Sequence, residues 1–177
     1  YAIGSLLLML VLVFSSCSTK KNTLTRRMYH NLTAHYNAYW NGRESLREGE
    51  RELKKTAEDN YTFVLNVYNY GTKENALNLN PYMDRAIEKG KKVVQKHSMP
   101  FNNKEYVRWI DDSWLMVGQA HFYKQDYTMA RRTFDYIIKQ YNYNAIKYDA
   151  MIWLAKTYIQ LKEYEKAQSL LDLVESK

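Results

Sequence analysis

Apolar positions in the second half of the chain recur with the period of amphipathic helices. One face comprises Trp114, Val117, Gly118, His121 and Phe122, and the next comprises Ala130, Phe134, Ile137, Ile138 and Tyr141. The pattern then returns through Met151, Leu154, Ala155 and Tyr158, and through Tyr164, Ala167, Leu170, Leu171 and Val174. Residues three and four positions apart share one side of a helix. Residues 101–177 are therefore predicted to form two helical hairpins.

The two hairpins match each other at a spacing of 37 residues. The matched pairs are Gly118 and Ala155, His121 and Tyr158, Tyr127 and Tyr164, and Ala130 and Ala167. Small residues let antiparallel helices approach closely, and the rings fill the remaining space. The stretches 114–130 and 151–167 resemble tetratricopeptide (TPR) repeats. They depart from that pattern in having His at 121, no closing Pro, and three residues beyond the usual 34, which we expect within 141–148.

The first half of the chain is less regular. Residues 25–40 and 43–57 read as a helical hairpin around an Asn41-Gly42 turn, and residues 59–80 read as irregular or partly extended. Asn80-Pro81 is then expected to start a helix that ends at 98–100. The buried stripe of that helix is predicted to be Met83, Ala86, Ile87, Gly90, Val93, Val94 and His97. Residues 25–100 would thus contain a degenerate repeat whose first helix is replaced by 59–80.

These patterns predict an all-α protein, a TPR-like solenoid of helical hairpins that follows a lipoprotein signal peptide. Two repeats are too few for a stable solenoid, because each unit buries its apolar face against neighbours. Either the N-terminal helices act as a cap, or more repeats follow Lys177. We expect the second, with 101–177 holding two repeats that are truncated at the C-terminus.

The start of the chain reads as an export signal. Residues 6–14 form an unbroken apolar run, which is too short for a membrane-spanning helix of about 20 residues and fits the apolar core of a signal peptide. The following Phe14-Ser-Ser-Cys17 resembles a bacterial lipobox. Residues 1–16 are therefore predicted to be a signal peptide, truncated because Met and a basic region are missing. Cys17 is the predicted lipidation site, and residues 17–24 the anchor and linker. Alternatively, cleavage occurs elsewhere and Cys17 is incidental.

The residues after Cys17 bear on location. No Asp follows the cysteine and no acidic cluster is present. By resemblance to known sorting signals, this favours the periplasmic face of the outer membrane over the cell surface. Lys20, Lys21, Arg26 and Arg27 either add about 1 kcal/mol each of attraction to anionic lipid or form a solvated linker.

Composition narrows the function further. The 26 Lys and Arg against 19 Asp and Glu give a net charge of +7. The excess is uneven, with 15 basic and nine acidic residues in 20–100 but 11 and 10 in 101–177. An export signal argues against nucleic acid as a partner. One Cys excludes an intrachain disulfide framework and a Cys-rich zinc site.

No catalytic constellation is present in the sequence. It lacks a phosphate loop, a nucleophile elbow and an HExxH motif. His30 and His35 make a poor metal pair, and His121 is interpreted as a satisfied core residue. Asp111 and Asp112 point about 100° apart on a helix and fit dipole complementarity better than catalysis. We therefore expect no enzyme, no metal, no small-molecule substrate and no cofactor other than lipid on Cys17.

The function that remains is binding through a surface of the repeats. In the repeat register the inner face carries Asp112, Leu115, Gln119, Phe122, Tyr123, Asp149, Ile152, Lys156, Ile159 and Gln160. Phe122 and Ile152 are expected to be repeat packing. The candidate partner-binding residues are Asp112, Leu115, Gln119, Tyr123, Asp149, Lys156 and Gln160.

Several runs resemble one family. They are 25–42, 84–89, 97–99 and 105–112, together with 17–23. These look like the TPR lipoproteins of Bacteroidetes gliding motility and type IX secretion (SprE/PorW type), of which the chain would be an N-terminal fragment. The resemblance implies a non-catalytic, lipid-anchored scaffold that links the outer-membrane translocon to periplasmic components through other protein subunits. A glycan-binding or other outer-membrane assembly TPR lipoprotein is the alternative.

Overall fold

The computed structural model describes residues 19–56, 61–62, 64–65 and 67–176, and the leader and Cys17 lie outside this part. The N-terminal elements are α2 (Leu24–Thr33), the π-helix η2 (Ala34–Tyr39), α3 (Trp40–Thr56) and α4 (Lys73–His97). A two-stranded hairpin of β1 (Pro100–Phe101) and β2 (Lys104–Glu105) follows. The remaining helices are α5 (Trp109–Tyr123), α6 (Tyr127–Gln140), α7 (Ile146–Gln160) and α8 (Tyr164–Glu175). The predicted all-α class is confirmed.

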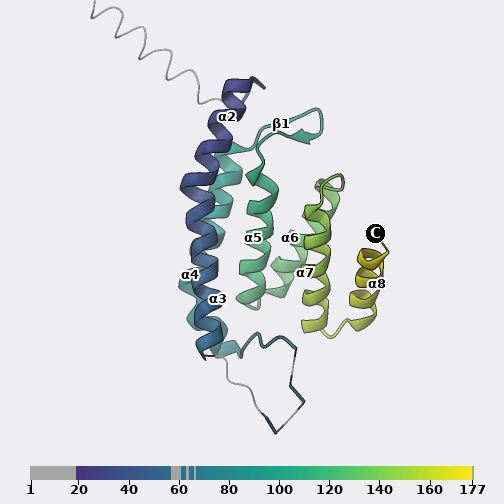
Figure 1. The fold of residues 1–177 in the computed structure, drawn as a ribbon. Coiled ribbons are helices and arrows are strands. Elements are labelled where there is room, and N and C mark those ends of the chain that lie inside the picture. The colour runs from purple at the N-terminus through teal and green to yellow at the C-terminus, as the bar shows by residue number, and fades with distance from the viewer. Residues whose placement is uncertain (1–18, 57–60, 63, 66, 177) are drawn as a thin grey trace, which may run out of the picture.

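The helices form an array in which each packs against the next one in sequence, from α3 to α8 (Figure 1). Contacts also join α3 to α5 and α5 to α7, so these three helices neighbour one another along one side. Helix α7 begins 37 residues after α5, and α8 begins 37 residues after α6. The structure thus contains the four helices predicted in 101–177, at the spacing of the sequence match.

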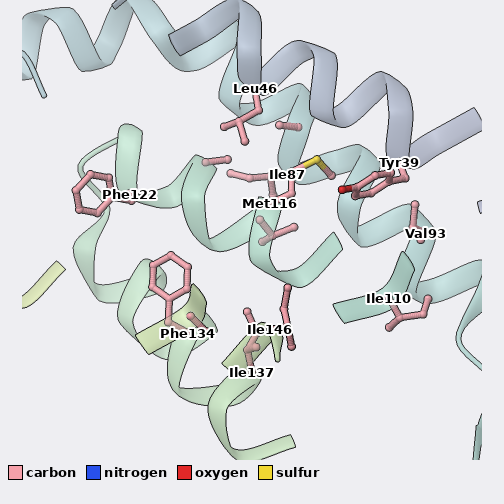
Figure 2. Packing of buried hydrophobic residues seen from close by; sticks show 14 of the residues in the cluster. Tyr39, Leu46, Ile87, Val93, Ile110, Met116, Phe122, Phe134, Ile137 and Ile146 are labelled. Carbon is pink, nitrogen blue, oxygen red and sulfur yellow. The ribbon is translucent and has the colours of Figure 1, made fainter. Parts of the chain in front are cut away.

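A single apolar core runs through the array. Figure 2 shows Leu46 of α3 and Ile87 of α4 meeting Met116 of α5, with Phe134 of α6 nearby. The ring of Phe134 packs directly on Gly118, since a Cβ added to that glycine would lie 2.4 Å from Phe134 Cε1. Most predicted stripe residues are buried. On α8, however, Tyr164 and Leu171 are exposed.

The expected turn at Asn41-Gly42 is wrong. Helices α2, η2 and α3 form one continuous rod from Leu24 to Thr56. Gly42 is buried, and a Cβ there would come within 2.7 Å of Met116 Cε. The glycine therefore serves close packing of the rod against α5, whereas the sequence analysis took it as the mark of a hairpin loop.

The expected start of a helix at Asn80-Pro81 is also wrong. Helix α4 begins two turns earlier, where Thr72 and Asn75 form a capping box that satisfies the first backbone amides. Pro81 lies inside the helix on its exposed side, where water can reach the carbonyl that lost its partner. Helix α4 packs on α3, so 59–80 does not replace a helix of this pair. The predicted end of the helix at 98–100 is confirmed, because α4 ends at His97 and Ser98 is its C-cap.

The short hairpin before α5 was not predicted. Asn102 and Asn103 adopt positive φ angles of 51° and 59°, which Asn tolerates better than most residues. The Glu105 carboxylate then organises the chain on both sides of the hairpin. Its Oε1 accepts the amides of Met99, Tyr106 and Val107 at 2.8–2.9 Å. Its Oε2 accepts the Ser98 hydroxyl at 2.7 Å. This one side chain holds the link between α4 and α5.

Candidate functional site

The predicted inner-face residues lie on α5 and α7 and line a series of hollows along the array. Tyr123 and Lys156 share a hollow of about 440 Å³. Lys156 and Gln160 share an adjoining one of about 630 Å³. Farther along, Asp112 and Gln119 line a smaller hollow of about 200 Å³. Asp112 also lines a hollow with Asp149. Six of the seven candidate residues therefore border hollows on this side.

Leu115 is the exception. It is half-buried and packs against the core cluster, and it lines none of these hollows. Phe122 is 1% exposed, as expected for a packing residue. Ile152 was also expected to be packing, yet it borders the hollow that holds Lys156 and Gln160.

Lys156 is the cationic centre of the two joined hollows. Its ammonium lies 4.4 Å from the centroid of the Trp153 ring and 4.8 Å from that of Tyr68, within the range of cation–π attraction. Burial lowers the pKa of Lys156, and the Glu50 carboxylate on α3 partly opposes that change. The Trp153 ring is in turn fixed by an edge-on contact with Phe122 at 5.4 Å. The Lys156 ammonium is thus held against the rings of Trp153 and Tyr68 at the wall of the hollow.

The segment after α3 crosses this side of the array. Its residues Val67, Tyr68 and Tyr70 line both joined hollows, so they form the partition between them. The Tyr70 ring meets Phe122 edge-on at 4.8 Å. The side-chain amide of Gln125 donates to the carbonyls of Gly71 and Thr72 at 3.3 and 3.2 Å. The turn between α5 and α6 therefore holds the end of the segment in place.

The remaining charged residues of the joined hollows are Glu50 and Lys54 of α3 and Lys162 of the turn after α7. Burial, and then the Glu50 carboxylate, raise the pKa of the Tyr123 hydroxyl, so the phenol stays protonated. Burial also raises the pKa of Tyr70 to about 12. Both phenols are therefore neutral, the Tyr70 hydroxyl is itself buried, and the charges of the lining are one carboxylate and three ammonium groups. Such a mixed lining suits hydrogen bonding and ion pairing with a peptide-like ligand.

The smaller hollow is lined by two cations, Arg43 and Arg47, and two carboxylates, Glu50 and Asp112. Burial raises the pKa of Asp112, and the guanidinium groups of Arg43 and Arg108 act against that increase. Arg43 donates to the Tyr39 hydroxyl at 3.0 Å, which places the guanidinium at the wall of the hollow. The inner side therefore offers several separated polar points in place of one converging pocket.

Sequence reasoning missed the part of the site that comes from outside the repeats. Glu50 sits among surface charges on α3, and nothing in its spacing marks it. Residues 67–70 were interpreted as irregular or extended, which is correct. The contact of Tyr68 with Lys156, however, joins residues more than 80 positions apart. The one available signal was the aromatic pair Tyr68 and Tyr70 in a polar segment.

The described histidines take part in packing contacts. His30 and His97 meet through their Nδ1 atoms at 3.0 Å, and His35 stacks on Trp109 at 4.0 Å. His121 is buried, and its Nδ1 lies 3.5 Å from the Asp126 carboxylate, but neither ring nitrogen makes a hydrogen bond, so the expected satisfaction is incomplete. Within the described residues no three His, Cys, Asp or Glu side chains gather as a metal site.

Asp111 and Asp112 lie in the first turn of α5, as their dipole interpretation requires. Asp111 is buried and accepts from the Asn144 side chain in the Tyr141–Ala145 link between α6 and α7. Burial, with the neighbouring Asp112 charge, raises the pKa of Asp111 to about 6. This aspartate therefore joins the two hairpins.

None of the helices in the described ranges is long and apolar enough to span a bilayer. Comparison of the chain with protein-family models and with curated proteins found no match.

Proposed function

We propose that this chain is a lipid-anchored scaffold of TPR-like helical hairpins that binds other proteins of type IX secretion and gliding motility. In this proposal the lipid on Cys17 fixes it to the periplasmic face of the outer membrane. The array then links the translocon to periplasmic components. It acts by recruitment, without catalysis or a cofactor beyond the lipid.

The observation that carries the binding role is the lined side of α3, α5 and α7. It offers Glu50, Tyr123, Trp153 and Lys156 along adjoining hollows of about 440 and 630 Å³. An extended peptide can place a carboxylate against Lys156 and a backbone group against the Tyr123 phenol. The link to secretion and gliding comes from the sequence runs named above, and the 37-residue helix spacing supports the repeat assignment.

A pulldown from envelope membranes tests the proposal. Protein captured on the wild-type chain would be identified by mass spectrometry, beside Lys156→Glu, which places a carboxylate next to Glu50. Lys139→Glu is the matched control, because Lys139 is exposed on α6 away from these hollows. We expect secretion components with the wild type and the control, and their loss with Lys156→Glu. Recovery of polysaccharide-uptake proteins without secretion components would refute the proposal.

The anchor has a separate test. Cys17→Ala removes the only thiol of the chain. The variant should move from the membrane fraction to the soluble fraction after cell lysis, and it should lose palmitate labelling. Unchanged labelling would show that the lipid is attached elsewhere.

A glycan-binding role is the second candidate, because Tyr68 and Tyr70 present nearly parallel rings. Their centroids are 6.0 Å apart with an interplanar angle of 20°, and Tyr68 is 60% exposed. Sugar rings stack on such surfaces. Calorimetric titration with bacterial and plant oligosaccharides would detect this role as heat that disappears in Tyr68→Ala.

A further inference from the structure

The rod formed by α2, η2 and α3 carries an exposed apolar stripe over its first half. We call this set the outer stripe. Its members are Leu24, Met28, Leu32, Tyr36 and Trp40, and each is between 51% and 72% exposed. The stripe ends sharply, because the same side of α3 continues with charged residues, of which Arg51 pairs with Glu44 at 2.7 Å. Single exposed apolar residues are common on protein surfaces, but five large ones in a row on one rod form a continuous patch, which is typical of an interaction site.

The outer stripe faces away from the protein, and its direction is fixed. The residues midway between its members, His30, Ala34 and Ala38, are buried against the body of the array. The Asn31 side chain accepts the Arg108 amide at 2.8 Å and donates to the Tyr106 carbonyl at 3.2 Å. These bonds prevent α2 from rotating to bury its apolar side. The rod lies at the end of the array opposite α8 (Figure 1), and within the described residues the stripe side chains stay exposed.

Charge around the outer stripe has one sign. Residues 19–43 contain five Lys and Arg and no Asp or Glu. Lys20 and Lys21 are exposed, and they lie at the beginning of the stripe. Two members of the stripe, Tyr36 and Trp40, and the neighbouring Tyr29 are exposed aromatic residues. Each has an apolar ring system and one polar atom. Such side chains favour the boundary between lipid headgroups and acyl chains.

We propose that the outer stripe inserts into the interface of an anionic lipid bilayer, so that α2 and η2 lie flat along the membrane. The apolar side chains would reach about 5–10 Å into the boundary between headgroups and acyl chains. Lys20 and Lys21 at the beginning of the stripe would meet lipid phosphates. The array would then contact the membrane through its first helix. This contact would fix the orientation of the side that carries the hollows relative to the membrane surface.

Charge and composition favour lipid over a protein helix as the occupant. A partner helix that packs on such a stripe needs flanking acids to pair with the basic residues, whereas the stripe itself offers no acid for the basic residues of a partner. A bilayer supplies phosphate for the basic residues at the beginning of the stripe and hydrocarbon for its apolar side chains. The proposal does not require acylation of Cys17.

The test uses the full chain with Cys17→Ala and one new cysteine that carries a nitroxide. Stripe positions are Met28→Cys and Leu32→Cys, and matched controls on the same rod are Glu48→Cys and Arg51→Cys. All four side chains are exposed, so the labels should not disturb folding. The labelled chains are mixed with vesicles of phosphatidylethanolamine and phosphatidylglycerol. Accessibility to oxygen is then compared with accessibility to a water-soluble nickel complex.

The stripe labels should show a severalfold higher ratio of oxygen to nickel accessibility than the control labels. Adding Leu32→Glu should weaken immersion of the label at 28 by about tenfold. Equal ratios at stripe and control positions would overturn the proposal, even if the leader keeps the chain on the vesicles. Spin–spin broadening at the stripe labels without vesicles would also overturn it, because a second copy would then cover the stripe. Neither result depends on acylation, so the anchor and the stripe fail separately.

Discussion

Replacing Glu105 by Ala should destabilise the whole array, although the residue lies in a short link. Its carboxylate accepts three backbone amides and one hydroxyl on both sides of the β1–β2 hairpin. Met99 and Val107, which supply two of those amides, are 0% and 1% exposed. The alanine variant leaves these donors in a place where water enters poorly, while the amide of Tyr106 keeps the Met99 carbonyl at 3.3 Å as a second acceptor.

The size of the effect follows from those donors. A buried donor without a partner costs about 1–3 kcal/mol. Two such amides, together with a hydroxyl that can rotate toward water, give an expected loss of about 3 kcal/mol in the free energy of unfolding. Glu105→Gln retains one carbonyl oxygen but removes the charge, which makes each bond about half as strong. Its expected loss is about 1 kcal/mol.

Urea unfolding followed by helical circular dichroism measures both losses. At a slope of about 2 kcal/mol per molar, Glu105→Ala should lower the midpoint by about 1.5 M. Glu48→Ala is the control, because Glu48 is exposed on α3 and makes none of these bonds. A loss in Glu105→Ala no larger than in the control would show that the link between α4 and α5 does not depend on the carboxylate.

Three further predictions use the same unfolding assay. Gly118→Ala should lower the free energy of unfolding by about 1–2 kcal/mol, because the new methyl group meets the buried ring of Phe134. Gly49→Ala should cost less, because its methyl group meets the flexible side chain of Met83. The reverse order of the two losses would contradict this packing. Pro81→Ala should raise stability by about 1–2 kcal/mol by restoring a hydrogen bond inside α4, and a lower midpoint would count against it. Burial lowers the pKa of His97 from 6.5 to about 4, so the unfolded chain binds this proton more readily and the folded state loses stability as the pH falls from 7 to 4. The wild type should lose on the order of 2 kcal/mol relative to His97→Gln over that range, and parallel curves would exclude the effect.

The sequence predicted best where the apolar period was regular. The four helices of 101–177 and their 37-residue repeat were found, because each buries a stripe whose spacing the chain itself displays. The errors at Gly42 and Pro81 have a different cause. Both residues usually mark breaks, but tertiary contact decided otherwise: Gly42 makes room for Met116, and the capping box at Thr72 starts α4 before the proline.

The candidate site was predicted in part for the same reason. Residues of α5 and α7 such as Tyr123 and Lys156 follow from the repeat register, since it sets which side of a helix faces inward. Glu50 and Tyr68 belong to other parts of the chain, and their approach to Lys156 depends on how α3 and the segment after it cross the array. No local pattern encodes that crossing.

The π-helix η2 determines the direction in which the side chains of the first half of the rod point. On a regular α-helix of 3.6 residues per turn, positions four apart advance by about 40°, so four such steps from Leu24 to Trp40 would rotate by about 160°. The π turn, in which the Trp40 amide bonds to the His35 carbonyl, accommodates an extra residue and takes back about 100°. The stripe from Leu24 to Trp40 therefore turns by only about 60°, so its members stay on one side of the rod while His30, Ala34 and Ala38 face the core. Deleting Asn37 would remove this phase correction and turn the beginning of the rod by about a quarter turn relative to its end.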